Sequence, residues 1–87
     1  MRKYIREAYK NYVRCELLKT RAAKGLSQER MAAILDMSGR AYTALESGKS
    51  CCSHITFALY LTRCCLDKDA FIAGLSDVLD KAEKEII

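Results

Sequence analysis

The side chains best suited to chemistry in this chain lie between residues 26 and 49, in the stretch LSQERMAAILDMSGRAYTALESGK. Arg40 has the reach and the two aligned donors that fit the edge of a guanine base, a contact that gives about 1–3 kcal/mol of discrimination. The Thr43 methyl group and Ala44 can touch thymine methyl groups, and Lys49 can pair with a phosphate. These residue types suit binding to a nucleic acid, where phosphate contacts give affinity and base contacts read sequence.

The other reactive side chains are five cysteines and one histidine: Cys15, Cys51, Cys52, Cys64, Cys65 and His54. The adjacent cysteine pairs have the wrong spacing for a zinc knuckle, whose paired ligands are separated by two to four residues. A Cys/His nucleophile pair also needs a third orienting group and an oxyanion site, and nothing in the sequence supplies them. We therefore expect small reduced cysteines, no metal or other cofactor, and no enzyme activity.

Capping and turn residues divide residues 26–49 into two short helices. Ser27 can accept a hydrogen bond from the amides that start one helix, and Ser38 can do the same for a second. Asp36 tolerates a left-handed backbone and can turn the chain between them, while Gly48 can end the second helix. Apolar residues recur at helical spacing in both, namely Met31, Ala32 and Leu35, then Tyr42 and Leu45. Two short helices joined by a three-residue turn are typical of a helix-turn-helix, whose second helix enters the DNA major groove.

The segments LSQERMA and ALESGK, with the turn between them, resemble the Cro/C1-type (XRE, phage-repressor-like) helix-turn-helix family of bacterial transcriptional regulators. The matching positions are Arg21, Gln28, Ala32, Glu46, Gly48 and Lys49, and the resemblance covers roughly residues 13–72. The chain departs from the family pattern at Asp36, Gly39, Leu45 and Cys52, where glycine, a larger polar residue, tryptophan and proline are frequent. The Gly39 difference bears most on function, because that position usually faces bases.

The resemblance implies an all-α fold, a five-helix lambda-repressor-like DNA-binding domain with extended N- and C-terminal helices. A single domain would span residues 1–87, with the helix-turn-helix at 27–48, an N-terminal extension at 1–12 and the C-terminal helix at 68–87. It also implies a bridge between Arg21 and Glu46 that is structural and not catalytic. The base-contact candidates are Gln28, Gly39, Arg40, Thr43 and Ala44, and the phosphate-contact candidates are Gln28, Thr43, Ser47, Gly48 and Lys49.

The rest of the chain reads as three further helices, over residues 2–24, 54–66 and roughly 69–86. Tyrosines in the N-terminal extension pack either on the chain's own C-terminal helix, leaving a monomer, or on a partner subunit. The helix at 54–66, with Phe57, Ala58, Leu61 and Cys64 inward, is apolar nearly all round, and the last helix carries a heptad-like seam. We expect a homodimer, with interface candidates Ile55, Leu59, Ile72, Leu75, Leu79, Ala82 and Ile86.

Length and charge agree with a small basic domain. The chain has 87 residues, enough for one domain with a small core. Residues 1–49 carry eleven Lys and Arg against five Asp and Glu, a balance of +6, and residues 50–87 carry four against six, a balance of −2. A basic half suits a side that faces phosphates, although a solvated basic helix without a partner has the same composition. Without a bilayer-spanning run or a signal peptide, we expect a cytoplasmic location.

Two classes of function follow from these patterns. The favoured one is sequence-specific binding of double-stranded DNA by a repressor-like transcriptional regulator. The alternative is a protein-interaction module, antitoxin-like or phage-derived, whose main contact is another protein. A basic surface around Gln28, Arg40 and Lys49 would favour DNA binding, and an apolar cover over the motif's second helix would favour protein interaction. No small-molecule substrate and no ligand-sensing module is evident.

Overall fold

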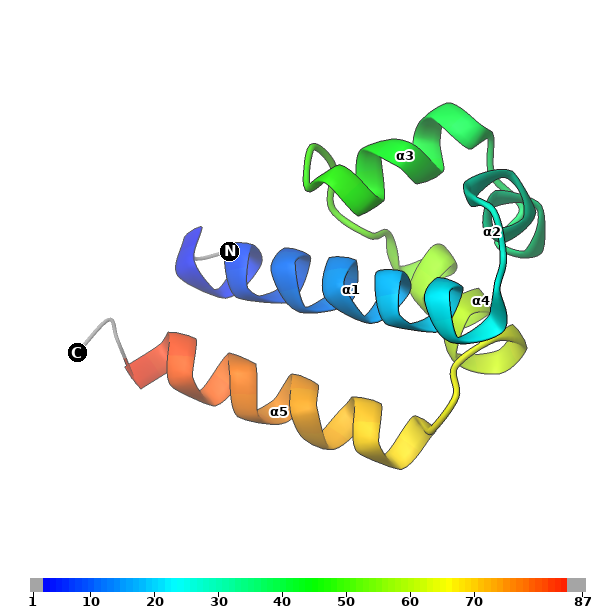
Figure 1. The fold of residues 1–87 in the computed structure, drawn as a ribbon. Coiled ribbons are helices and arrows are strands. Elements are labelled where there is room, and N and C mark those ends of the chain that lie inside the picture. The colour runs from blue at the N-terminus through cyan, green and yellow to red at the C-terminus, as the bar shows by residue number, and fades with distance from the viewer. Residues whose placement is uncertain (1–2, 85–87) are drawn as a thin grey trace.

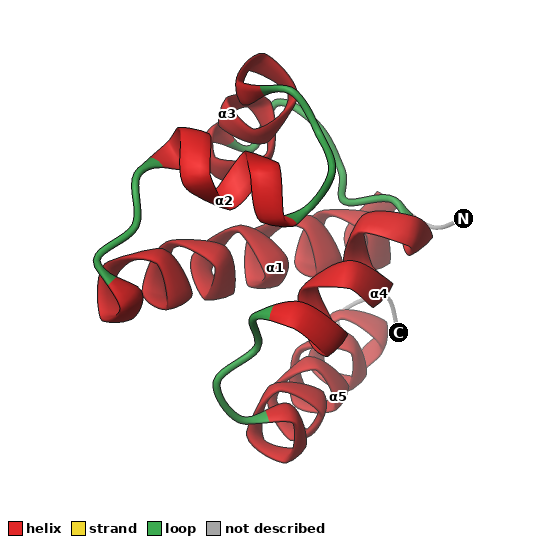
Figure 2. Ribbon diagram, turned by 90° about the vertical axis from the view of Figure 1, so that its right-hand side faces the viewer, coloured by secondary structure: helices red, strands yellow, loops and turns green. Residues whose placement is uncertain are grey.

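The computed structural model describes residues 3–84, which form five helices and no strands (Figure 1, Figure 2). The helices are α1 (Lys3–Lys24), α2 (Gln28–Ile34), α3 (Gly39–Ser47), α4 (His54–Arg63) and α5 (Lys68–Lys84). In Figure 1, α1 lies between the α2–α3 pair and α5, and α5 runs antiparallel to α1. The all-α class is therefore confirmed. None of these helices is long and apolar enough to cross a membrane.

Four of the helices, α2 to α5, begin just after a residue whose side chain caps them. Ser27, Ser38 and Ser53 each accept a hydrogen bond from the backbone N–H three residues later, at 3.1–3.2 Å. The Asp67 carboxylate accepts the equivalent bond at the start of α5, at 3.0 Å. Because the first amides of a helix have no partner inside it, each cap stabilises its helix by about 1 kcal/mol. The capping serines in the sequence therefore predicted the starts of α2, α3 and α4 to within one residue.

Left-handed backbone conformations end two helices and form the turn between α2 and α3. Gly25 (φ 64°) follows α1, and Gly48 (φ 83°) caps α3. Asp36 (φ 55°) is the residue other than glycine that adopts this conformation within the described part of the chain. Arg63 on α4 holds the turn, because its guanidinium donates to the carbonyl of Ile34 at 2.7 Å and lies 3.5 Å from the Asp36 carboxylate.

One apolar core joins all five helices. Each helix contributes a side chain that is 2% exposed or less, namely Leu17, Met31, Tyr42, Tyr60 and Phe71 in chain order. The hydroxyl groups of Thr20 and Tyr60 lie 2.8 Å apart, so each satisfies the other inside this core. The core therefore fixes the α2–α3 pair relative to the long helix α1.

The N-terminal extension packs on the chain's own helices. Tyr12 donates a hydrogen bond from its hydroxyl to the carbonyl of Phe71 at 2.8 Å, and the two rings lie 5.3 Å apart. Tyr9 donates to the carbonyl of Cys52, in the loop before α4, at 3.1 Å. Tyr4 remains 58% exposed. The extension was predicted to pack either on the C-terminal helix of the same chain or on a partner subunit. The structure shows the first contact for Tyr12, which packs on α5, while Tyr4 lies on the surface.

The structure corrects the prediction for α4 in two respects. This helix ends at Arg63 and not at residue 66, because the backbone of Cys64 leaves the helical region at φ −141°. Ala58 was expected to face inward and is exposed, whereas Tyr60 is 2% exposed. Turning the large ring inward removes more apolar surface from water than turning the methyl group inward would.

Candidate nucleic-acid interface

The Glu46 carboxylate, near the end of α3, is the centre of a polar cluster that joins three helices. Arg21 on α1 binds it with two nitrogens, Nε at 2.6 Å and Nη2 at 3.2 Å. Gln28 on α2 donates from Nε2 at 2.9 Å, and the hydroxyl of Tyr42 donates at 2.5 Å. The Arg21–Glu46 bridge that the resemblance implies is therefore present. It has the bidentate geometry in which guanidinium and carboxylate bind most strongly.

The cluster keeps Glu46 charged although its side chain is only 6% exposed. Burial alone would raise the pKa of this carboxyl, but the hydrogen bonds from Arg21, Tyr42 and Gln28 outweigh burial and lower it below its ordinary value. The hydrogen bond to Glu46 raises the pKa of the Arg21 guanidinium. Burial and the bond to Glu46 raise the pKa of Tyr42, so its hydroxyl stays a donor. The arrangement orients α3 and carries no group poised to exchange a proton near neutral pH.

Local sequence explains how the cluster forms. Arg21 lies in the last turn of α1, and its Nη1 also donates to the carbonyl of Leu26 at 3.2 Å, which holds the α1–α2 connection. Tyr42 and Glu46 are four residues apart on α3 and so share a face. The sequence predicted Tyr42 as a core residue and missed its hydrogen bond, although the four-residue spacing to Glu46 was available as a signal.

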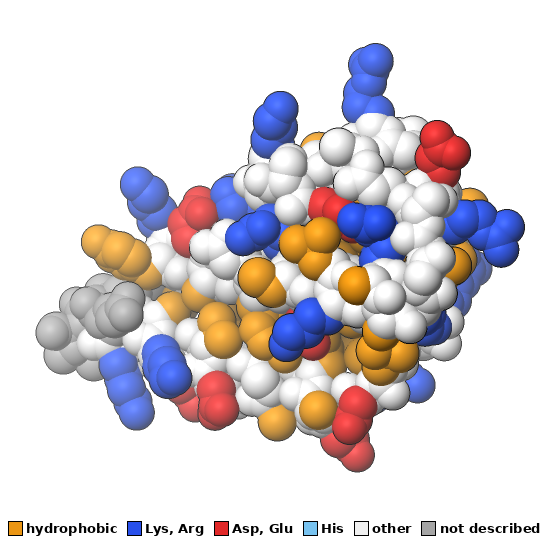
Figure 3. Space-filling model, in the orientation of Figure 1, with side chains coloured by type: hydrophobic (Ala, Val, Ile, Leu, Met, Phe, Trp, Pro, Cys, Tyr) orange, Lys and Arg blue, Asp and Glu red, His pale blue; other side chains and the backbone are white. Residues whose placement is uncertain are grey.

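The outer face of α3 is exposed and polar. Its exposed residues are Gly39, Arg40, Thr43 and Ser47, and Ala44 is half-buried at the edge of the face. Arg40 makes no ion pair with any residue between 3 and 84, so its guanidinium is available to a ligand. Lys and Arg side chains project from the α3 edge of the molecule in Figure 3. No apolar neighbour covers this face within the described residues.

Gly39, the first residue of α3, has open space around it. A Cβ atom placed there would have no heavy atom within 4 Å, and its φ is not in the left-handed region. Packing therefore does not require glycine at this position. Gly39 presents no side chain at the start of α3, and Arg40 is the long side chain beside it.

The side chain of Gln28 is engaged inside the protein. Its amide nitrogen donates to Glu46, and its amide oxygen lies 3.3 Å from the Thr43 hydroxyl. The same hydroxyl lies 2.9 Å from the Gly39 carbonyl, and its single hydrogen serves one acceptor at a time. Gln28 is a candidate for both base and phosphate contacts, and these internal bonds leave one N–H of its amide for such a contact.

The amides near the end of α3 are also used internally. The N–H groups of Gly48, Lys49 and Ser50 donate to carbonyl groups of α3 at 3.0–3.3 Å, and the Ser47 hydroxyl donates to the Ala44 carbonyl at 3.2 Å. Amides of this segment, which contains the phosphate-contact candidates Ser47 and Gly48, are therefore already paired, because a capped helix end satisfies its own groups. The exposed Lys49 side chain remains as the phosphate candidate of this loop.

Arg14 on α1 joins this surface, and the sequence patterns did not indicate it. A Cβ atom placed on Gly48 would lie 3.4 Å from Cδ and 3.7 Å from Nε of Arg14. The Arg14 side chain therefore lies against the end of α3, one residue from Lys49. A contact between residues 34 positions apart has no signature in helical spacing, so only the folded chain reveals it.

The predicted dimer residues differ in their exposure. Ile55 and Ile72 are 59% and 48% exposed, and Leu59, Leu75 and Leu79 are half-buried. Ala82 is only 6% exposed, so little of its side chain is accessible to a second copy of the chain. Ile86 lies outside the described residues.

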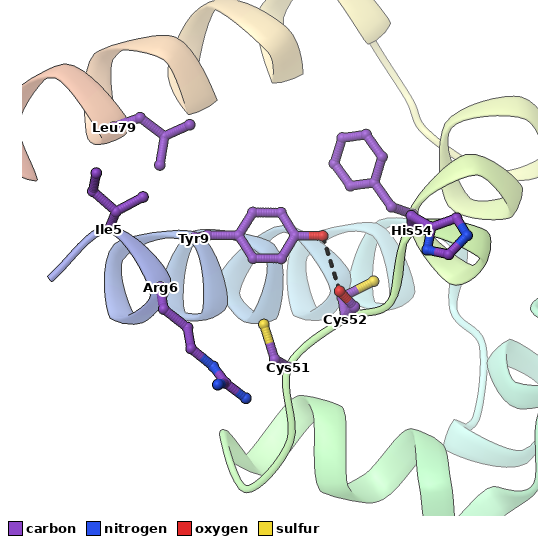
Figure 4. A pocket seen from close by; sticks show the side chains of 8 residues that line it. Ile5, Arg6, Tyr9, Cys51, Cys52, His54 and Leu79 are labelled. Carbon is purple, nitrogen blue, oxygen red and sulfur yellow. Dashed lines mark hydrogen bonds between the residues drawn. The ribbon is translucent and has the colours of Figure 1, made fainter. Parts of the chain in front are cut away.

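A hollow of about 510 Å³ adjoins these residues, between α1, α5 and the start of α4 (Figure 4). Ile5, Tyr9, Phe57 and Leu79 form apolar parts of its lining, and Arg6 is its charged member. In Figure 4, Arg6 leaves α1 on the side of Cys51, away from Leu79. The apolar hollow and the polar face of α3 are therefore different surfaces.

All five cysteines are free thiols. Cys52 and Cys64 are buried, Cys51 and Cys65 are half-buried, and Cys15 is exposed. Burial raises the pKa of Cys52 to about 11 and also raises that of Cys64. Within residues 3–84, no three His, Cys, Asp or Glu side chains lie close enough together to hold a metal ion.

No family model, curated protein or solved structure matches this chain. The interpretation of the site therefore depends on its geometry. That geometry offers a short helix with an exposed polar face, fixed to two other helices through one carboxylate, with cations at both ends.

Proposed function

We propose that this protein binds double-stranded DNA as a repressor-like regulator of transcription, and that α3 is its recognition helix. The observation that carries the proposal is the exposed polar face of α3, held rigidly by the Glu46 cluster. A recognition helix must enter the major groove in a fixed orientation, because base-edge hydrogen bonds are directional. We further propose that the five helices have the lambda-repressor-like arrangement, and that the protein is a binding protein and not an enzyme.

In this proposal Arg40 reads sequence and Lys49 supplies affinity. Arg40 donates two hydrogen bonds to O6 and N7 of a guanine, and the Thr43 methyl group and Ala44 contact thymine methyl groups. Lys49 pairs with a phosphate and adds to binding of any sequence. Gly39 leaves room for the start of α3 to approach the bases closely.

The reading face of α3 is small, so a single copy of the protein specifies few base pairs. Proteins with this motif commonly bind as twofold dimers on half-sites one helical turn apart. Exposed Ile55 and Ile72, with half-buried Leu79 beside the hollow, supply apolar surface for such pairing. We therefore propose a homodimer formed through α4 and α5, on the side of the molecule away from α3.

A second candidate function rests on the same apolar surface. If the hollow and the exposed side chains of α4 and α5 bind a different protein, the chain is an interaction module and α3 is not its main contact. The observation that favours this alternative is the exposure of three large apolar side chains at 48–59%: Ile55 on α4, Leu66 between α4 and α5, and Ile72 on α5. It differs from the main proposal in predicting no selection among DNA sequences.

Selection from a random library of short DNA duplexes tests the proposal. We expect enrichment of one sequence pattern, and tighter binding of the enriched duplex than of random duplexes when fluorescence anisotropy is measured at two salt concentrations. Both affinities should fall with salt, because phosphate contacts release counterions. Failure to enrich any pattern, together with equal affinity for all duplexes, would refute sequence-specific binding.

A further inference from the structure

The basic residues of α1 continue the surface that begins at the end of α3. Arg6, Lys10 and Arg14 follow one another at intervals of four residues and so share one side of α1. Arg14 lies against Gly48, and Arg6 lies beside Cys51 in the lining of the hollow (Figure 4). The loop that carries Lys49 therefore runs along this side of α1.

Two of these three cations, and Lys49, are without partners in the described part of the chain. Arg6, Arg14 and Lys49 make no ion pair and no side-chain hydrogen bond between residues 3 and 84. Lys10 differs, because Glu7 binds it at 3.2 Å. Figure 3 shows Lys and Arg side chains projecting on the same side from α3 and from the N-terminal part of α1.

We propose that Arg6 and Arg14 bind DNA phosphates, so that α1 extends the footprint of α3 along the DNA backbone. Eight residues of helix separate the two, a rise of about 12 Å. Phosphates in one strand rise about 3.4 Å per step along the duplex axis, so an α1 that lies along this axis would span about three steps between Arg6 and Arg14. Unpaired guanidinium groups at this spacing suit a line of phosphates, and Lys49 connects the line to the recognition helix.

This inference rests on the proposed DNA binding and adds a specific division of work. Contacts to phosphates carry no sequence information, so α1 should raise affinity for every duplex equally. The N-terminal half of α1 would then have two roles on two sides. Tyr9 and Tyr12 attach it to the core, and the arginines face the DNA.

The test compares charge-removing variants of the full chain on one selected duplex and on random duplexes. Arg6→Gln and Arg14→Gln should each lower the slope of log affinity against log salt by about 0.9, and the double variant by about 1.8. Lys68→Gln with Lys81→Gln, on exposed positions of α5, is the matched control and should leave the slope unchanged. Arg14→Lys should keep the slope, which separates the role of charge from packing on Gly48. Circular dichroism checks that each variant is folded.

Three outcomes would overturn the inference, and they can be told apart. If the wild type binds duplexes but the Arg6/Arg14 double variant keeps the slope of the α5 control, α1 lies outside the footprint and the proposed function stands. If the wild type binds no duplex at low salt, the proposed function fails and this inference fails with it. A loss confined to the selected duplex would also overturn it, because phosphate contacts act on all sequences.

Discussion

Replacing Glu46 by alanine should destabilise the fold strongly, because four hydrogen bonds converge on this one carboxylate. Arg21 has a side chain that is 27% exposed, so water can solvate part of its guanidinium in the variant. Tyr42 is fully buried and would keep an unpaired hydroxyl, which costs about 1–3 kcal/mol. Together with the loss of the charge-assisted bonds, we expect the free energy of unfolding to fall by about 2–4 kcal/mol.

Urea and thermal unfolding followed by circular dichroism measure this loss. For a chain of this size, each kcal/mol lowers Tm by about 4–8 °C, so the variant should melt at least about 8 °C below the wild type. Glu29→Ala is the control, because Glu29 is exposed on α2 and its removal should change stability by less than about 0.5 kcal/mol. Equal stabilities of the Glu46→Ala and Glu29→Ala proteins would refute the role given to the cluster.

The pH dependence of stability provides a second test of the Glu46 carboxylate. The pKa of Glu46 in the folded protein lies below its ordinary value of 4.5, so the unfolded chain binds its proton more readily. The stabilisation is therefore complete above the unfolded pKa and is lost as the pH falls through the folded pKa. The Glu46→Gln variant has no ionisable group at this position, so this pH-dependent contribution to its stability is absent. The stability difference between wild type and variant should shrink on acidification, and a difference that is constant from pH 7 to below pH 4 would contradict the depressed pKa.

The remaining predictions concern binding, thiol reactivity and assembly. Arg40→Ala should weaken binding of the selected duplex by about 1–3 kcal/mol and relax sequence choice. Lys49→Ala should weaken binding of all duplexes alike and lower the slope of log affinity against log salt by about one. If Arg40→Ala weakened binding of selected and random DNA equally, base reading by Arg40 would be refuted. Alkylation of the native protein at pH 8, followed by peptide mass spectrometry, should modify exposed Cys15 well before Cys52, whose pKa burial raises to about 11, because the thiolate is the reactive form. If α4 and α5 form a homodimer, Leu79→Glu should dissociate it with helical content kept, and a wild-type sedimentation mass that stays at 9.8 kDa at all micromolar concentrations would exclude the dimer.

The parts of the fold that the sequence predicted are those set by neighbouring residues. Ser27 and Ser38 start helices because their own side chains bond to amides three residues away. Gly48 ends α3 because a left-handed backbone is least costly for glycine. Such rules act over one helical turn, so they need no knowledge of the rest of the chain.

Contacts between distant residues were the ones that sequence reasoning could not supply. Periodicity identifies the apolar face of α1, but it does not choose between α5 and a partner subunit as the surface on which Tyr12 packs. The observed bond from Tyr12 to the Phe71 carbonyl spans 59 positions, and the contact of Arg14 with Gly48 spans 34. Each depends on how helices pack in three dimensions, which is also why the inward side of α4 was predicted incorrectly at Ala58.

If α3 is a recognition helix, the engagement of Gln28 limits the base contacts that it can make. Its amide is held between Glu46 and Thr43, so breaking those bonds to reach a base would weaken the cluster that orients the helix. Gly39 offers no side chain, and the Cβ of Ala44 offers a methyl group alone. In the proposed complex, base reading would depend mainly on Arg40, and one bidentate contact separates sequences by only about 1–3 kcal/mol. Since specific DNA binding typically exceeds non-specific binding by about 4–10 kcal/mol, a DNA-binding role for this chain requires a second copy on a second half-site, or energy from the shape of the DNA, in addition to Arg40.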